Sequence, residues 1–149
     1  MNSIYEPATL KELTERLNKL TPFSQRLWGK MDVAQMMAHC SALIEMALGD
    51  KMTKAGFMEK LIGKFVKPMI TNEKPFKQNM PTGSTFLIAD SKDFDTEKSR
   101  LAILLKRFST GGPEYMHRRK HSFFGSLTSK EWSNSTMKHL DHHFRQFGV

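Results

Sequence analysis

The sequence lacks the features that define several large classes of protein. Its single cysteine, Cys40, cannot close a disulfide within one chain, so nothing requires an oxidising compartment. No apolar run approaches the roughly 20 residues that span a bilayer. The opening residues, MNSIYEPATL, lack the basic start, apolar middle and cleavage site of a secretory signal. We therefore expect a cytoplasmic protein with no membrane insertion.

Acidic residues are also scarce. The chain has 15 Asp and Glu residues and 23 Lys and Arg residues, which gives a net charge of +8 and a pI near 9.7. This balance permits nucleic acid, anionic lipid or an anionic substrate as a partner. No helix-turn-helix, zinc-finger or RNA-binding signature accompanies the charge, so we expect no specific nucleic-acid binding. The length of 149 residues and the 39% hydrophobic content predict one globular domain, residues 1–149.

Helix-capping signals and apolar spacing divide the chain into five helical segments. The sequences TLKE and TSKE, at Thr9–Glu12 and Thr128–Glu131, predict capping boxes. Asp32 and Asp95 predict two further N-caps, while Gly49 and the Gly111-Gly112-Pro113 sequence predict ends. The predicted helices cover about residues 9–20, 33–48, 55–69, 96–110 and 129–146.

The third segment is amphipathic, and we expect the protein to bury its apolar side. Pro68 should end or kink this helix. A long loop is predicted from residue 71 to 93, with only the short apolar stretch 86–89 resembling a strand, and a second loop precedes residue 128. The apolar side of the third segment contains Phe57, Met58, Leu61, Ile62, Phe65 and Met69.

Together these segments predict an all-α fold, an antiparallel four-helix bundle with an additional short helix and long loops. The last helix carries three of the six histidines. His139 and His143 are four residues apart and differ by about 40° around the helix, so both rings can meet one ion. His142 lies about 60° from His139 and fits a shared site less well. The same helix face includes Trp132, Ser135 and Gln146, a mixture that can orient imidazoles by hydrogen bonds.

His39 lies on the second helix, among the apolar residues Met36, Cys40, Leu43 and Ala47. A histidine on such a face is either hydrogen-bonded within the core or a metal ligand. Three neutral imidazoles would leave a coordination position open, as in catalytic sites. Zinc or nickel are the leading ions, although imidazole also suits iron and copper.

Two stretches resemble the DinB-like superfamily of four-helix-bundle proteins, many of them regarded as metalloenzymes. WGKMDVAQMMAHCSALIEMAL resembles its early helix, with His39 at the ligand position, and KHLDHHFRQFGV resembles its last helix, with His139 and His143 at the other two. The resemblance is to an uncharacterised branch. It implies a bundle, a three-histidine divalent metal site and, from characterised relatives, hydrolysis, or transfer and isomerisation reactions of low-molecular-weight thiols.

The leading hypothesis is therefore a metal-dependent enzyme with a small-molecule substrate, anionic or thiol-bearing, whose catalytic residues beyond the ligands are unassigned. The alternatives are a non-catalytic metal- or ligand-binding bundle and a nucleic-acid or membrane-surface binder, and self-association into a homodimer stays open. His117 is expected in a solvated loop, whereas His121 fits either that loop or the mouth of the metal pocket equally well. We expect Cys40 to be buried and Asp141 to face solvent.

Overall fold

The computed structural model describes residues 2–51, 56–80, 86–117 and 119–149, except for the side chains of residues 57–60. The all-α prediction is confirmed, because five helices and one short hairpin make up the regular structure of these residues. None of the described helices is long and apolar enough to cross a bilayer. In chain order the elements are α1 (Pro7–Lys19), α2 (Val33–Leu48), α3 (Phe57–Thr71), α4 (Phe94–His117), β1 (Lys120–His121), β2 (Gly125–Ser126) and α5 (Ser129–Gln146).

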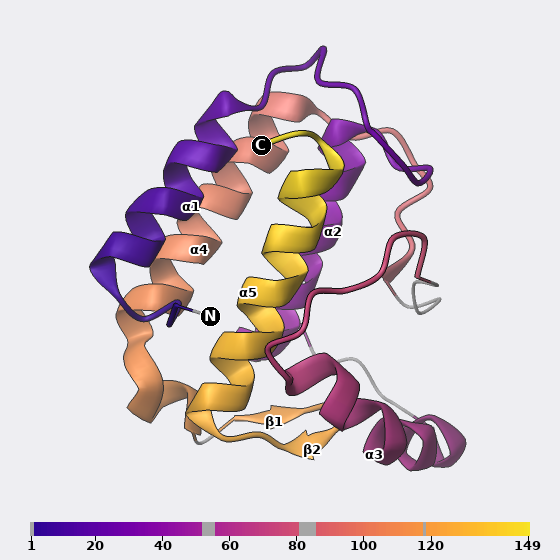
Figure 1. Ribbon diagram of the computed structural model, residues 1–149, viewed down its shortest axis with the longest axis vertical. Coiled ribbons are helices and arrows are strands. Elements are labelled where there is room, and N and C mark those ends of the chain that lie inside the picture. Colours follow the sequence, from indigo (N-terminus) through magenta and orange to yellow (C-terminus); the bar gives the residue numbers. More distant parts are fainter. Residues whose placement is uncertain (1, 52–55, 81–85, 118) are drawn as a thin grey trace.

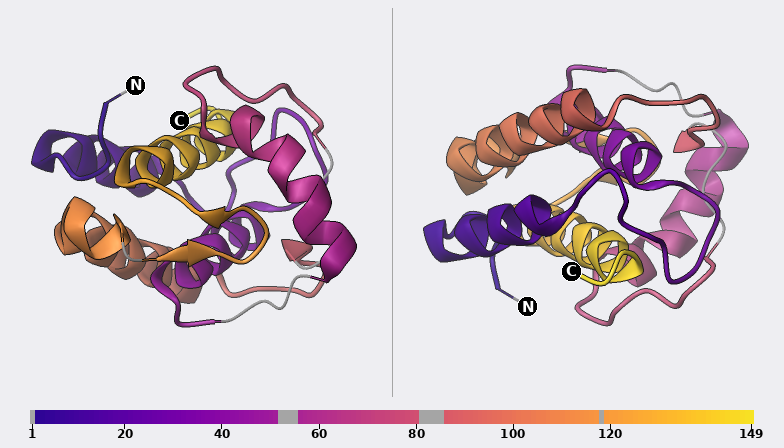
Figure 2. Two further views of the ribbon diagram at one scale, coloured as in Figure 1. Left: turned by 90° about the horizontal axis from the view of Figure 1, so that it is seen from below. Right: turned by 90° about the horizontal axis from the view of Figure 1, so that it is seen from above.

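Four helices, α1, α2, α4 and α5, form the bundle (Figure 1). α1 and α5 run in one direction and α2 and α4 in the other, so α2 and α5 are antiparallel. Seen along the helices, the four occupy the corners of a square, and α3 lies across one end and side of it (Figure 2). α3 and the chain that follows it make the long connection that allows α2 and α4 to run in the same direction.

The core contains Leu, Ile, Met and aromatic side chains from all four bundle helices. Methionine fills much of the α2 contribution, since Met36 and Met37 are fully buried, and Cys40 is buried beside Met36 as expected. Trp132, Phe108 and Phe144 are the largest fully buried side chains. α5 therefore contributes core residues on both sides of the turn that carries the histidines.

The predicted caps of α2 and α5 are confirmed. The Asp32 carboxylate accepts a hydrogen bond from the backbone amide of Gln35 at 2.8 Å, and the side-chain oxygen of Gln35 accepts one from the backbone amide of Asp32. Thr128 and Glu131 form the same reciprocal pair at the start of α5. At the end of α2, Gly49 has a φ of 78°, the left-handed conformation in which an L side chain would be strained.

The predicted cap at Thr9 is wrong. α1 begins two residues earlier, with Pro7 in its first turn, because a proline at this position loses no helical hydrogen bond. Thr9 therefore lies inside the helix, where its side chain is buried and its hydroxyl has no hydrogen-bond partner. The TLKE sequence has the residue types of a capping box but does not form one.

The start and the end of α4 also differ from prediction. Asp93, not Asp95, accepts from the Thr96 amide and caps the helix. Gly112 has non-helical angles, φ 76° and ψ 173°, so a first helical piece ends there as predicted, but helical structure resumes after this kink and reaches His117. Pro113 starts that second piece, where a missing amide hydrogen costs nothing. His117 is thus helical and exposed, not in a loop.

Two further features were not foreseen. The second loop contains a hairpin in which β1 pairs with β2, His121 opposite Gly125, and its residues were too few to produce a strand pattern. In the long loop, residues 86–89 form no strand; Phe86 has 3₁₀ geometry and residues 87–89 have no regular secondary structure. Pro81 and Gly83 of this loop lie outside the described residues.

α3 differs from expectation in which side it buries. The helix continues through Pro68 to Thr71, so of the two outcomes expected at the proline, an end to the helix is excluded. Its apolar side is expected to be buried, but the side chains of Leu61, Ile62, Phe65 and Met69 are all exposed. Phe57 and Met58, which were expected on the same side, lie outside the described side chains. α3 packs on α5 through its other face.

The two TxKE sequences give a matched test of capping. Thr128→Val should lower the free energy of unfolding by about 1 kcal/mol, because valine keeps the shape and loses the bond to the Glu131 amide. Thr9→Val should be neutral or stabilising, since it removes a buried hydroxyl without a partner. Urea denaturation followed by circular dichroism measures both; an equal loss in the two variants would contradict the assignment of the caps.

Candidate metal centre

The three histidines that the sequence selects lie together. His39 on α2 and His139 and His143 on α5 each offer one ring nitrogen, and these three atoms all lie within 4.8 Å of one another. The Nε2 atoms of His39 and His139 are 2.9 Å apart. The ring centroids of the three are separated by 4.6–4.8 Å. No carboxylate or cysteine belongs to this group among the residues that the structure describes.

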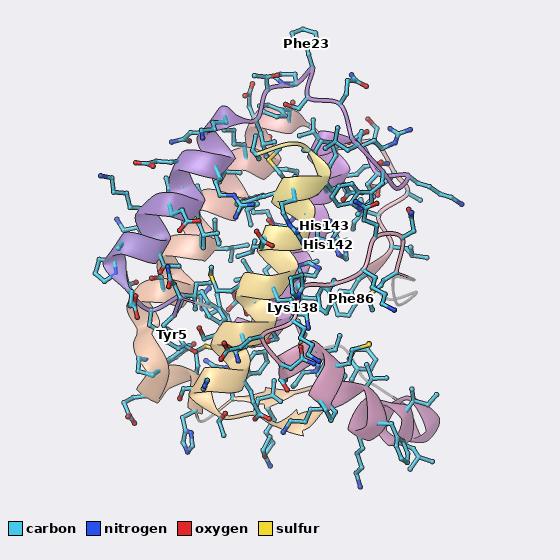
Figure 3. All side chains as sticks on the ribbon, in the orientation of Figure 1. Tyr5, Phe23, Phe86, Lys138, His142 and His143 are labelled. Atoms are coloured by element: carbon cyan, nitrogen blue, oxygen red, sulfur yellow. The ribbon has the colours of Figure 1, made fainter. Side chains whose placement is uncertain are left out.

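His39 is oriented by the long loop. Its Nδ1 lies 2.9 Å from the backbone oxygen of Phe86. Because a carbonyl oxygen only accepts, the neutral ring must carry its proton on Nδ1, which leaves a lone pair on Nε2. Figure 3 labels Phe86, which belongs to the chain between α3 and α4. The loop thus fixes which nitrogen of His39 faces the other two rings.

His143 is oriented by its own helix and by the chain that precedes α2. Its Nδ1 lies 2.8 Å from Oε1 of Gln146, three residues further along α5. The orientation of this amide is set by its other end, because Gln146 Nε2 donates to the Trp28 carbonyl at 2.7 Å. Oε1 must then accept from His143 Nδ1, so the lone pair of His143 is on Nε2. Gln146 has the orienting role that its spacing indicated.

Gly29 makes room for this arrangement. A Cβ at residue 29 would lie 2.3 Å from Gln146 Nε2, and the φ of 82° also disfavours any L side chain. The backbone amide of Leu27 donates to the Gln146 carbonyl at 2.7 Å. The segment before α2 is therefore held against the end of α5 by two hydrogen bonds. Both end on backbone groups of the segment, so no side-chain pattern predicts them.

Burial keeps the three rings neutral. Desolvation lowers the pKa of His143 to about 3, with the nearby His39 contributing. It lowers the pKa of His139 well below 6.5, with repulsion from His143 and His39 adding to the effect. The pKa of His39 is lowered by burial as well, against a smaller opposite effect of its bond to Phe86. Neutral imidazoles are the form that binds metal.

The donor set fits a divalent ion. Two unprotonated Nε2 atoms are held inward by outer hydrogen bonds on Nδ1, the pattern that orients metal-bound histidines in proteins. Two ligand nitrogens on a tetrahedral ion lie about 3.3 Å apart, close to the 2.9 Å between His39 and His139. In the described arrangement His139 must donate its Nε2 proton to His39, and an ion between the rings would take the place of that proton.

His142 is buried beside the cluster but outside it. Its ring lies edge-on to those of Trp28 and Phe76, with centroids 5.8 and 5.9 Å apart, and 5.1 Å from that of His143. Burial lowers its pKa. Its Nδ1 is buried without a hydrogen-bond partner in the described structure. The offset of His142 around the helix thus directs the ring into an aromatic wall, as the 60° difference indicated.

His121 lies in an aromatic cluster at the hairpin, so it is neither solvated nor among the three clustered rings. Its ring stacks on Phe124 with centroids 4.1 Å apart and tilts against Trp132 at 5.4 Å. Nδ1 accepts from the backbone amides of Phe123 and Phe124, at 3.1 and 3.4 Å. Burial lowers its pKa to about 4.

Asp141 differs from expectation in its surroundings. It does not simply face solvent, because its carboxylate pairs with Arg16 of α1 at 3.1 Å and with Arg145 at 3.0 Å. Arg16 also donates to the backbone oxygen of Val149 at 2.9 Å. The pairing ties α1 to the end of α5 and directs the carboxylate away from the histidines. Asp141 is therefore not placed to act as a general base at this site.

Comparison with known proteins adds a family but no activity. The family described as "Protein of unknown function (DUF1569)" matches residues 6–148. The chain belongs to this family. No curated protein and no solved structure matches it. The match extends over all five helices, so the three histidines lie within the family's domain and not in an appended segment.

The neutral, buried ring of His121 predicts a loss of stability in acid. Its pKa of about 4 lies below the ordinary 6.5, so the unfolded chain binds the proton more tightly than the folded chain does. The contribution of the neutral His121 ring to the free energy of unfolding is therefore lost as pH falls from 6.5 towards 4. His121→Asn retains an acceptor for the two amides but cannot titrate. In urea denaturation, the free energy of unfolding of His121→Asn should fall over this pH range by up to about 3 kcal/mol less than that of the wild type.

The control is His117→Asn, which removes an exposed histidine at the end of α4. Its pH dependence of unfolding should follow that of the wild type. If His121→Asn and His117→Asn give the same slope, protonation of His121 does not limit stability in acid.

Proposed function

We propose that His39, His139 and His143 bind one divalent metal ion, zinc or nickel, and that the protein is a metal-dependent enzyme. The observation that carries this proposal is the convergence of the three rings while the outer nitrogens of two are committed to Phe86 and Gln146. Three neutral imidazoles that converge in this way would bind a cation through three lone pairs at once, in place of the hydrogen bond between His39 and His139.

The resemblance to the DinB-like superfamily supports the proposal. In that superfamily the early-helix histidine and the H-x-x-x-H pair of the last helix are the metal ligands, which correspond here to His39, His139 and His143. The four-helix arrangement, with α2 and α5 antiparallel, brings those positions together. Hydrolysis and the chemistry of small thiols, known in characterised relatives, are the reactions proposed for this chain.

A divalent ion held by three imidazoles would supply Lewis-acid chemistry, lowering the pKa of a water or of a substrate thiol at an open position. The residues of the chain would hold the ligands neutral, fix their orientation through Phe86 and Gln146, and exclude water with the aromatic rings of Trp28 and Phe76. The net charge of +8 would favour a substrate that carries a carboxylate.

The alternative is a bundle that binds metal without catalysis. The observation that favours it is the absence of a carboxylate from the histidine group among the described residues, since many hydrolytic sites add a general base. Activity separates the two. Metal-loaded wild type should accelerate ester hydrolysis or the addition of a small thiol to an electrophile, and loaded His142→Ala should resemble it. Full metal loading without any such acceleration would favour the binder.

The metal ligands are tested by two neighbouring substitutions. His143→Ala should reduce the bound metal of protein purified without an affinity tag to a small fraction of wild type, while circular dichroism shows an intact bundle. His142→Ala should change the metal content much less, because this ring faces Trp28 and Phe76. Elemental analysis by mass spectrometry measures both. Metal lost from the His142 variant and kept in the His143 variant would contradict the assignment of His139 and His143 as the ligands on α5.

Gln146 provides a second test that leaves the ligands unchanged. Gln146→Leu removes the acceptor for His143 Nδ1, and metal affinity should fall about 10- to 100-fold. Gln146→Glu keeps an acceptor oxygen at that position. Its metal affinity should therefore lie closer to that of the wild type than the affinity of Gln146→Leu does. Competition with a chromophoric chelator gives the dissociation constants. Equal affinities for Gln146→Leu and wild type would exclude an orienting role.

A further inference from the structure

α3 packs on the bundle through the side that contains Gly63 and Lys67. Gly63 lies so close to the hairpin that a Cβ there would be 2.3 Å from the backbone oxygen of Phe123. Lys67 donates to the backbone oxygen of Ser126 at 3.0 Å and pairs with Glu131 at 3.0 Å. A glycine and a lysine therefore make close contacts of α3 with the hairpin and the start of α5.

The end of α3 is held by polar groups of α5. Lys138 donates to the backbone oxygen of Met69 at 2.6 Å and to Asn72 Oδ1 at 2.9 Å, and Asn134 donates to the backbone oxygen of Thr71 at 3.0 Å. Lys138 is almost fully buried to reach these positions. These bonds satisfy carbonyls at the helix end and hold α3 in its rotation.

The opposite side of α3 is a continuous apolar surface. Its four described side chains occupy an arc of about 100° around the helix. Such a cluster on a monomer marks a surface that binds something, because scattered apolar residues need no explanation but a contiguous group does. The exposed fractions are 43% for Leu61, 56% for Ile62, 81% for Phe65 and 44% for Met69.

The charge of α3 and of the whole chain indicates what binds to this apolar surface. α3 contains three lysines and one acidic residue, Glu59, and Lys64 is exposed next to the apolar arc. The whole chain carries +8, so a second copy would bring like charge to the contact, whereas an anionic lipid surface would bring opposite charge. Phosphates of a nucleic acid would satisfy the lysines but not the exposed Phe65, Ile62 and Leu61.

We propose that α3 binds the surface of an anionic lipid bilayer, with Leu61, Ile62, Phe65 and Met69 among the acyl chains and Lys64 at the headgroups. A helix with an apolar face and lysines beside it lies in the interface plane and spans nothing. α3 is placed for this contact because it projects from the bundle in Figures 1 and 2. The sequence alone had predicted this face to be buried.

Vesicle sedimentation tests the proposal with a matched pair of phenylalanines. Phe65→Ser should weaken binding to vesicles of mixed phosphatidylglycerol and phosphatidylcholine about tenfold, because the most exposed apolar side chain of the patch is lost. Phe23→Ser should bind as wild type does. Phe23 is 85% exposed but lies at the other end of the molecule from α3 (Figure 3).

Lipid charge and salt complete the test. Wild type should bind vesicles of pure phosphatidylcholine much more weakly, and added salt should weaken binding to the anionic vesicles. Lys64→Glu should also weaken binding to anionic vesicles, and the control is Lys11→Glu, at an exposed lysine of α1. Equal binding by Phe65→Ser and wild type, or equal loss in Phe65→Ser and Phe23→Ser, would overturn the proposal.

Sedimentation velocity without lipid tests the rival occupant. Wild type and Phe65→Ser should both sediment as monomers, with unchanged circular dichroism. A wild-type dimer that Phe65→Ser converts to monomer, together with no vesicle binding, would show that a second copy covers α3 and that the proposal is wrong. Metal content does not enter either measurement, so failure here leaves the three-histidine site untouched.

Discussion

The structure depends on how the outer nitrogens of two buried histidines are bonded. The Phe86 carbonyl accepts a hydrogen bond from His39 Nδ1, and Gln146 Oε1 accepts one from His143 Nδ1, so both inner nitrogens present lone pairs to the same point. Burial then keeps all three rings of the cluster uncharged. The segment before α2, the long loop and the end of α5 are each fixed by one partner in this set of bonds.

α5 connects the candidate site to the rest of the molecule. Its core side contains Trp132, Leu140 and Phe144, and its polar residues hold α3, α1 and the segment before α2. The capping box at Thr128 fixes where this helix starts, and therefore which residues reach each neighbour. A one-residue shift of α5 would turn His139 and His143 by about 100° away from His39.

Sequence reasoning recovered what local chemistry encodes. The H-x-x-x-H spacing, the apolar stripe around His39 and the helix caps at Asp32 and Thr128 each depend on residues within one helix, and the structure brings the three histidines together. It could not find Phe86 or Trp28, which act through backbone oxygens that every residue type has. It also failed at α3, because amphipathic spacing shows which side is apolar but not which side the protein covers.

X-ray absorption at the metal edge tests the central claim most directly, using untagged protein purified without added metal. The account predicts one ion per chain with three imidazole nitrogens at about 2.0 to 2.1 Å, recognised by the multiple scattering of the rings. The three rings on α2 and α5 would be those ligands. A spectrum of oxygen neighbours without imidazole scattering, from folded protein supplied with zinc or nickel, would contradict it.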